Sequence, residues 1–173
     1  ISLGLVGSEM CIRDSVWTPI PPSSFATLAG ATVLVNLSAS NALVGKSKYR
    51  HDLVAQQSAR CLAAYVYTSA GAGESTNDLA WDGQSLIYEK GDLLAESDRF
   101  EDEAYIKFAD IDLDRLIHDR IRTTTFSDSV RHHAAALSDY RTHLINMTGA
   151  YLPETDLNLS LIHISEPTRP RLI

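Results

Sequence analysis

Two short apolar segments constrain the fold of this chain more than any other feature. ATVLVNL, residues 31–37, and AYVYTSA, residues 64–70, are rich in β-branched or aromatic side chains. The first shows no polar–apolar alternation, which is typical of a strand that is covered on both faces. Between the two lies a helical pattern from about Ser47 to Ala63, whose apolar positions share one side of the helix. The order strand, helix, strand predicts an α/β layered domain.

Further elements extend this prediction along the chain. The patterns predict a turn at 18–24, a short helix through 25–29, a hairpin around Lys90-Gly91, a strand at 105–111, a helix from Asp112 to about Arg122 and a polar helix over 130–144. We expect Ser23 or Ser24 to cap the short helix and Asp112 to cap the later one, because short polar side chains accept hydrogen bonds from the first free N–H groups of a helix.

The two ends of the chain are related to each other as DNA rather than as protein. A DNA sequence that encodes LSLIHISEPTR, residues 159–169, has a reverse complement that encodes LVGSEMCIRD, residues 5–14, when it is read from the second base. An inverted repeat around an insert is what a transposase-type sequencing adapter leaves behind. We therefore predict that residues 1–15 and 159–173 are non-native, adapter-derived segments, and we exclude them from fold reasoning. Cys11 falls in the first of these segments.

Composition excludes several classes of protein. The net charge of −7 and the isoelectric point of about 5.2, without a basic stripe, argue against nucleic-acid binding. No apolar run is long enough to span a membrane, so no membrane partner is expected. Outside the predicted adapter segments Cys61 is the single cysteine, which fits a reducing, cytoplasmic location. The histidines lack the spacing of a zinc site, so no metal is expected.

The segment between the two ends resembles a known family. The motif WTPIPPSS, the loop SASNALVGK and the run SARCLAAYVYTSAGAGEST are similar to the amidase domain of bacterial glutamine-dependent NAD synthetases. That domain belongs to the nitrilase, or carbon–nitrogen hydrolase, superfamily. The resemblance runs from Val16 to about Phe100 and continues more loosely to about Ala134. It implies a partial nitrilase-type α-β-β-α sandwich, the C-terminal half of the domain, over residues 16–125, and a helical linker over 126–158.

The resemblance also implies which residues carry function. The family's nucleophile motif, C-E-D-x-W-x-P-x-P-P-S, places its cysteine at Arg13 when it is aligned on Trp17, so we expect no catalytic residue in this chain. Ser40 and Lys46 match the serine and the basic residue that hold glutamine, although a lysine lacks the bidentate fork of the arginine found in some relatives. Glu74, in GAGEST, is expected near the substrate pocket. That loop lacks the G-K-[ST] ending of a phosphate loop.

These residues imply a part of a larger enzyme. The resemblance implies a parent domain that hydrolyses L-glutamine with a cysteine nucleophile, and a synthetase domain of the same protein that uses ATP and Mg to convert deamido-NAD to NAD. It also implies a homo-oligomeric parent. We expect no cofactor in this fragment, and we expect the fragment alone to be inactive. Two alternatives remain: a stand-alone nitrilase-type amidase, and a catalytically dead module that supports oligomerisation.

Overall fold

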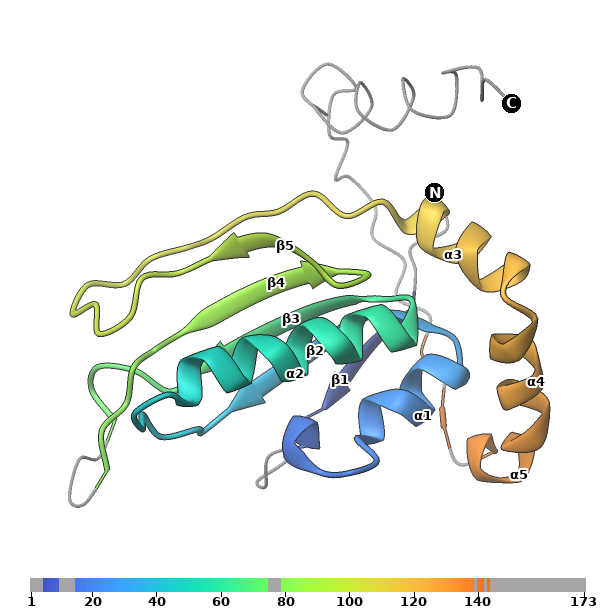
Figure 1. The fold of residues 1–173 in the computed structure, drawn as a ribbon, viewed down its shortest axis with the longest axis horizontal. Helices are drawn as coiled ribbons and strands as arrows, with labels where there is room; N and C mark the ends of the chain where they lie inside the picture. Colours follow the sequence, from blue (N-terminus) through green and yellow to red (C-terminus); the bar gives the residue numbers. More distant parts are fainter. Residues whose placement is uncertain (1–4, 10–14, 75–78, 139, 142, 144–173) are drawn as a thin grey trace, which may run out of the picture. The chain divides into compact units, whose positions relative to one another are not determined.

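A five-stranded sheet organises the part of the chain that the structure describes (Figure 1). The computed structural model describes residues 5–9, 15–74, 79–138, 140, 141 and 143. The strands follow one another in chain order across the sheet: β1 (Leu5–Glu9), β2 (Ala31–Ser38), β3 (Ala64–Ser69), β4 (Ser85–Glu89) and β5 (Asp92–Glu96). The pairs β1–β2 and β2–β3 are parallel, whereas β3–β4 and β4–β5 are antiparallel.

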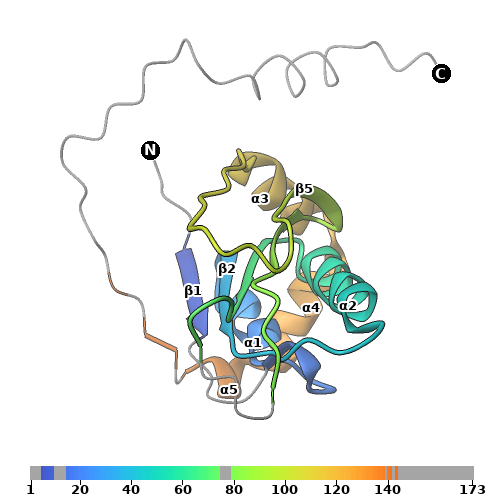
Figure 2. The same ribbon diagram turned by 90° about the vertical axis from the view of Figure 1, so that its left-hand side faces the viewer.

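Helices cover one face of this sheet and one of its ends. The helices are α1 (Pro22–Leu28), α2 (Lys46–Cys61), α3 (Leu113–Arg122), α4 (Thr124–His132) and the short α5 (Ala134–Leu137), and a 3-10 turn spans Ser15–Trp17. Both α1 and α2 pack on the same face of the sheet, with α4 beside α1 (Figures 1 and 2). Within the described residues no helix is both long and apolar enough to cross a membrane.

The core lies between the sheet and α1 and α2. Its most deeply buried apolar side chains come from three strands and from α2, and each is at most 1% exposed: Leu34, Tyr65, Tyr67, Leu86 and Val54. This arrangement of one helix layer on one sheet layer confirms the predicted α/β class and the partial sandwich.

The prediction that residues 31–37 are covered on both faces is wrong in part. Leu34 and Asn36 are buried, but Val33 and Val35 are only half-buried and Leu37 is 52% exposed. Successive side chains of a strand point to opposite faces, so α1 covers one face of β2, while Val33, Val35 and Leu37 on the other face stay partly exposed. The apolar run is therefore a strand whose second face remains partly open.

Several predicted elements are confirmed with their local causes. The helix expected over 47–63 is α2, and the predicted hairpin is β4–β5. At its turn Lys90 and Gly91 both have positive φ angles, 51° and 97°, as a two-residue type I′ turn requires. Asp112 caps α3 as expected, because its carboxylate accepts a hydrogen bond from the main-chain N–H of Arg115 at 2.9 Å.

The cap expected for α1 is wrong. Pro21 occupies the N-cap position, and no side chain caps this helix. The hydroxyl oxygens of Ser23 and Ser24 instead accept hydrogen bonds from the Gln57 side-chain amide, at 3.0 and 2.9 Å. The two serines therefore join α1 to α2 across the layer.

Two later predictions also fail. Residues 105–111 form no strand, since alternation produces a strand only where a partner strand is present, and most of this segment is exposed. The polar helix begins earlier than expected, at Thr124, and is interrupted at His133 between α4 and α5. The end expected at Leu144 lies outside the described residues, as do most of the residues beyond 141.

Strand β1 lies inside the segment that the sequence assigns to adapter DNA. It pairs with β2 through main-chain groups, for example with Val6 opposite Val33. Main-chain hydrogen bonds are open to any sequence without proline, so this position does not identify where the residues come from. The non-native origin of 1–15 and 159–173 stays a prediction. Arg13 and Cys11 lie outside the described residues.

Candidate functional site

The candidate site is the edge of the sheet where β2 and β3 end. The loop 39–45 follows β2, and the segment 70–84 joins β3 to β4. The two are joined by a hydrogen bond from the Ala42 main-chain N–H to the Ala80 carbonyl, at 2.7 Å. Ligands of open α/β sheets bind outside the carboxyl ends of the parallel strands, where such loops meet. This edge is therefore where the sheet presents polar groups to a ligand.

A hollow of about 330 Å³ lies at this edge. Residues at the ends of both parallel strands and in the following loops line it: Leu37, Ser38, Ala39, Thr68, Ser69, Ala70, Glu74 and Trp81. Glu74 is exposed there, and its main-chain N–H donates to the Gly71 carbonyl at 3.3 Å, which closes a tight turn after β3. The structure thus places Glu74 in a hollow, as a carboxylate that can reach a bound cation.

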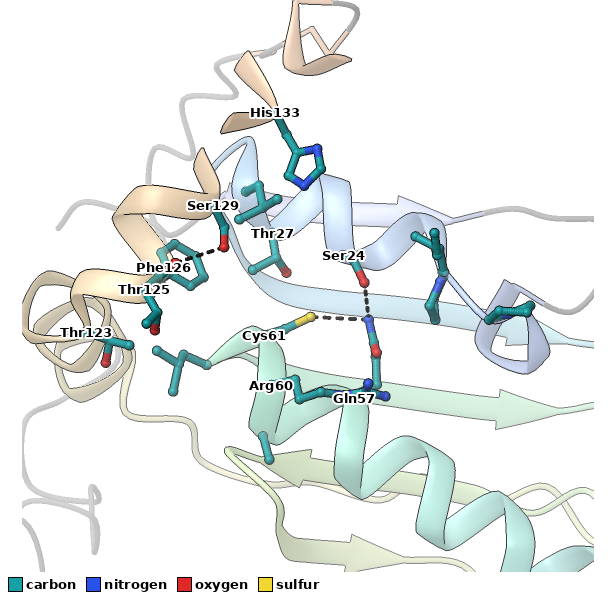
Figure 3. A pocket seen from close by; sticks show the side chains of 16 residues that line it. Ser24, Thr27, Gln57, Arg60, Cys61, Thr123, Thr125, Phe126, Ser129 and His133 are labelled. Carbon is teal, nitrogen blue, oxygen red and sulfur yellow. Dashed lines mark hydrogen bonds between the residues drawn. The ribbon is translucent and has the colours of Figure 1, made fainter. Parts of the chain in front are cut away.

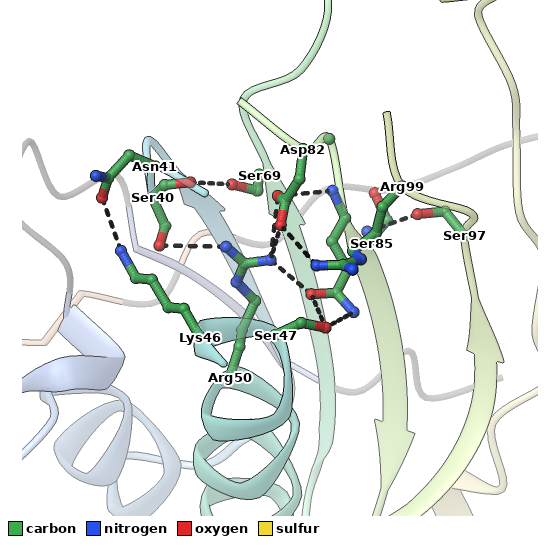
Figure 4. A network of polar contacts seen from close by, with 12 residues as sticks. Ser40, Asn41, Lys46, Ser47, Arg50, Ser69, Asp82, Ser85, Ser97 and Arg99 are labelled. Carbon is green, nitrogen blue, oxygen red and sulfur yellow. Dashed lines mark hydrogen bonds and ion pairs between the residues drawn. The ribbon is translucent and has the colours of Figure 1, made fainter. Parts of the chain in front are cut away.

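Ser40 lies in the loop 39–45, and Lys46 follows this loop at the start of α2 (Figure 4). Ser40 is 1% exposed, and its main-chain carbonyl accepts a hydrogen bond from Ser69 Oγ at 3.0 Å. Lys46 begins α2, and its Nζ donates to Asn41 Oδ1 at 2.8 Å and lies 5.0 Å from the ring centroid of Trp17. The lysine is therefore held inside the loop. Neither Ser40 nor Lys46 is among the residues that line the hollow with Glu74.

The sequence did not indicate the buried ion pair beside Ser40. Arg50 is completely buried and Asp82 is 2% exposed, and Arg50 Nη1 donates to the two carboxylate oxygens of Asp82 at 2.9 and 3.1 Å. Arg50 Nη1 also donates to Gln84 Oε1 at 2.5 Å, and Arg50 Nη2 to Ser40 Oγ at 3.4 Å. Figure 4 shows the guanidinium between the Ser40 loop and Asp82. The pair links the first turns of α2 to both loops of the candidate site.

A second cavity, of about 460 Å³, lies between α1, the end of α2 and α4 (Figure 3). Cys61 lines it and is 5% exposed, as expected for a core residue, and its Sγ accepts a hydrogen bond from Gln57 Nε2 at 3.2 Å. Burial raises the pKa of the Cys61 thiol. A thiol that stays protonated is a weak nucleophile, so this cavity does not supply the reacting group of a cysteine hydrolase.

No cluster in the described part of the chain offers three or more histidine, cysteine, aspartate or glutamate side chains to a metal ion. The polar groups at the candidate site are instead hydroxyls, amides, Lys46, the exposed carboxylate of Glu74, the buried pair, and Arg99, whose Nη1 lies 3.8 Å from Asp82 Oδ2. Donors for a carboxylate and an acceptor for an ammonium are thus both present, on separate parts of this edge.

Comparison with known proteins identifies relatives of the chain. No protein-family model matches it. The glutamine-dependent NAD(+) synthetases of Mycobacterium tuberculosis and Mycobacterium leprae are each 50% identical to it, over 133 and 140 residues, or 77% and 80% of this chain. These matches cover 19% and 20% of the two relatives, so the chain spans about a fifth of their length.

A solved structure shows the fold independently. The carbon–nitrogen hydrolase of Helicobacter pylori G27 superimposes with a TM-score of 0.59 at 20% identity, over 81% of this chain and 51% of that one. The chain is thus a homologue of the glutamine-dependent NAD(+) synthetases, corresponds to a fragment of their glutaminase domain, and has the fold of the carbon–nitrogen hydrolases.

Proposed function

We propose that this chain is part of a glutaminase domain that hydrolyses the side-chain amide of L-glutamine. A cysteine thiolate attacks the amide carbon, ammonia leaves, and water then cleaves the glutamyl thioester to release glutamate and restore the thiol. The ammonia serves a synthetase domain of the same protein, which uses ATP and Mg to convert deamido-NAD to NAD. The observation that supports this proposal is the 50% identity to glutamine-dependent NAD(+) synthetases, over a segment that includes the loops of the candidate site.

The polar groups of the site suggest how glutamine is held. Lys46 is proposed to meet the α-carboxylate, and the Ser40 hydroxyl to donate a second hydrogen bond to it. Glu74 is proposed to accept from the α-ammonium. Because Ser40 is 1% exposed, glutamine contacts its hydroxyl only when residues 41–45 of the loop move outward, while Ser40 itself keeps its contacts with Arg50 and Ser69. Glutamine binding and a shift of this loop are therefore coupled in the proposal.

The chain alone is proposed to be inactive, because Arg13 stands where the family's motif has its nucleophile. We also propose a homo-oligomeric, cytoplasmic parent protein. A reducing compartment suits Cys61, which is a free, buried thiol.

A chimaera tests the proposed function. Residues 16–141 of this chain replace the matching segment of the Mycobacterium tuberculosis synthetase, which keeps its own residues on both sides. NAD formation is measured with glutamine and, separately, with ammonium chloride, which bypasses the glutaminase reaction. We expect activity with both nitrogen sources. A chimaera that makes NAD from ammonium but not from glutamine contradicts the proposal.

Lys46→Ala in this chimaera tests the proposed carboxylate contact. Loss of a charged hydrogen bond costs about 1.5–3 kcal/mol, which is roughly a 10- to 150-fold loss in kcat/KM for glutamine. Because the α-carboxylate is remote from the amide, the effect should fall mainly on KM. Lys46→Arg should keep most of the activity. Unchanged glutamine kinetics in Lys46→Ala would show that this lysine only stabilises the loop through Asn41.

A further inference from the structure

We propose that Arg50 and Asp82 are a positioning pair that holds the Ser40 hydroxyl as a hydrogen-bond donor toward the substrate carboxylate. The inference rests on the proposed function, and neither residue is assigned a role by the family resemblance. The buried pair lies at the carboxyl edge of the sheet (Figure 4).

The pair fixes two loops relative to α2. Asp82 lies in the segment that leads into β4, and its main-chain carbonyl accepts a hydrogen bond from the Phe100 N–H at 2.8 Å. Each of its two carboxylate oxygens accepts a hydrogen bond from Arg50, which lies near the start of α2. A buried charge without its partner is strongly destabilising, so the guanidinium and the carboxylate hold each other in place. The end of the guanidinium that faces Ser40 is thereby fixed.

The chemistry of the guanidinium determines how Ser40 is oriented. A guanidinium has N–H donors and no acceptor, so in its contact with Arg50 Nη2 at 3.4 Å the Ser40 oxygen must accept. The hydroxyl proton of Ser40 is then directed elsewhere and is able to donate. Since Ser69 also holds the Ser40 main chain, the residue is fixed at both its main chain and its side chain. Such a hydroxyl is suited to a carboxylate, which only accepts.

Stability alone is a weak explanation for this pair. Replacing a buried ion pair with well-packed apolar side chains is often neutral or stabilising, so proteins do not need one to hold a core together. This pair also does not lie in the middle of the core. It lies where the loops of the candidate site meet, within hydrogen-bond distance of a residue proposed to bind glutamine. Positioning explains both its chemistry and its place.

Arg50→Lys in the chimaera tests the pair. Lysine keeps the charge but loses the planar fork that reaches Asp82 and Ser40 together. We expect KM for glutamine to rise about tenfold, with kcat within about twofold, because a contact remote from the amide is weakened. NAD formation from ammonium should not change. The matched control is Lys48→Ala, two residues earlier on α2, where the lysine side chain is 81% exposed. In this variant KM and kcat for glutamine and the rate of NAD formation from ammonium should all stay unchanged.

Asp82→Asn provides a second variant, because it keeps the shape of the side chain and removes its charge. It should raise KM in the same way. The rate at which iodoacetamide labels the nucleophilic cysteine shows, for each variant, whether the glutaminase domain is folded. A variant that is labelled at the parent rate but has an unchanged KM overturns the inference.

A double-mutant cycle distinguishes positioning from a general structural effect. If Arg50 acts through Ser40, Arg50→Lys should add less than about twofold to KM in a Ser40→Ala background, since residues that act through one contact are not additive. Independent, multiplicative effects overturn the inference. An unsubstituted chimaera that fails on glutamine overturns the proposed function and this inference together. An active chimaera in which Arg50→Lys behaves like Lys48→Ala overturns only the role of the pair.

Discussion

At the scale of single residues, Arg120 joins parts of the chain that are far apart in sequence. It is 8% exposed and donates to the main-chain carbonyls of Ala31 at 2.7 Å and Leu62 at 3.0 Å. Burial lowers the pKa of Arg120 to about 10, so the guanidinium stays charged at neutral pH. Arg120→Met should remove these hydrogen bonds and lower the stability of the domain by about 2 kcal/mol. Heat unfolding of the chimaera measures this loss, and Arg122→Met, at an exposed position of α3, should have little effect.

Arg50 shows where prediction at the residue scale fails. Its place in the helical pattern put it among the polar positions of α2, and arginines are rarely fully buried unless they are paired. Its partner Asp82 lies 32 residues later, in a segment without regular structure. No spacing in the sequence connects the two, because the path of that segment brings them together. By contrast, the family resemblance identified three candidate site residues, Ser40, Lys46 and Glu74. Their roles stay proposals.

At the scale of elements, the Lys90–Asp119 contact joins the β4–β5 turn to α3. Lys90 Nζ lies 2.5 Å from Asp119 Oδ2, and this hydrogen bond lowers the pKa of Asp119 below its usual value of 3.8. A lowered carboxylate pKa contributes stability that is present above the unfolded pKa and lost as pH falls through the folded one. Asp119→Asn should therefore lower the unfolding midpoint at pH 7 and should have a smaller effect as pH falls below the usual carboxyl pKa of 3.8.

The control for this pH dependence is Asp110→Asn, at an exposed position outside the helices. It should change the unfolding midpoint little at either pH. An Asp119→Asn variant that is as stable as the parent at pH 7 would show that the contact does not hold α3 on the turn.

Elements were predictable where local signals and tertiary packing agree. The β4–β5 turn has a glycine where a positive φ is needed, and Asp112 supplies a cap, so both features were found from the sequence. Residues 105–111 have the alternation of a strand, yet they have no partner in the sheet and remain irregular. Strand formation depends on a neighbour that a local pattern does not contain.

At the scale of the whole molecule, the open face of the sheet determines how the isolated chain should behave. Leu37 is 52% exposed on β2, and Leu93 and Leu94 on the edge strand β5 are 45% and 41% exposed. Exposed apolar strands at an open edge promote pairing with other chains. We expect the purified 173-residue chain to associate at micromolar concentration and to unfold without a sharp transition. Sedimentation velocity and calorimetry measure both properties.

The same physical argument predicts how association responds to substitution. Leu37→Ser removes an apolar side chain from the open face while α1 and α2 on the covered face are untouched, so it should shift the sedimentation profile toward the monomer. Asp52→Ser, on the exposed side of α2, is the matched control and should leave the profile unchanged. In the chimaera, residues of the relative are expected to cover this face, and Leu37→Ser should then destabilise the domain rather than improve its solubility. A monomeric parent chain with a sharp, cooperative melt would contradict the argument, because it would show that the fragment does not need a second layer over its sheet.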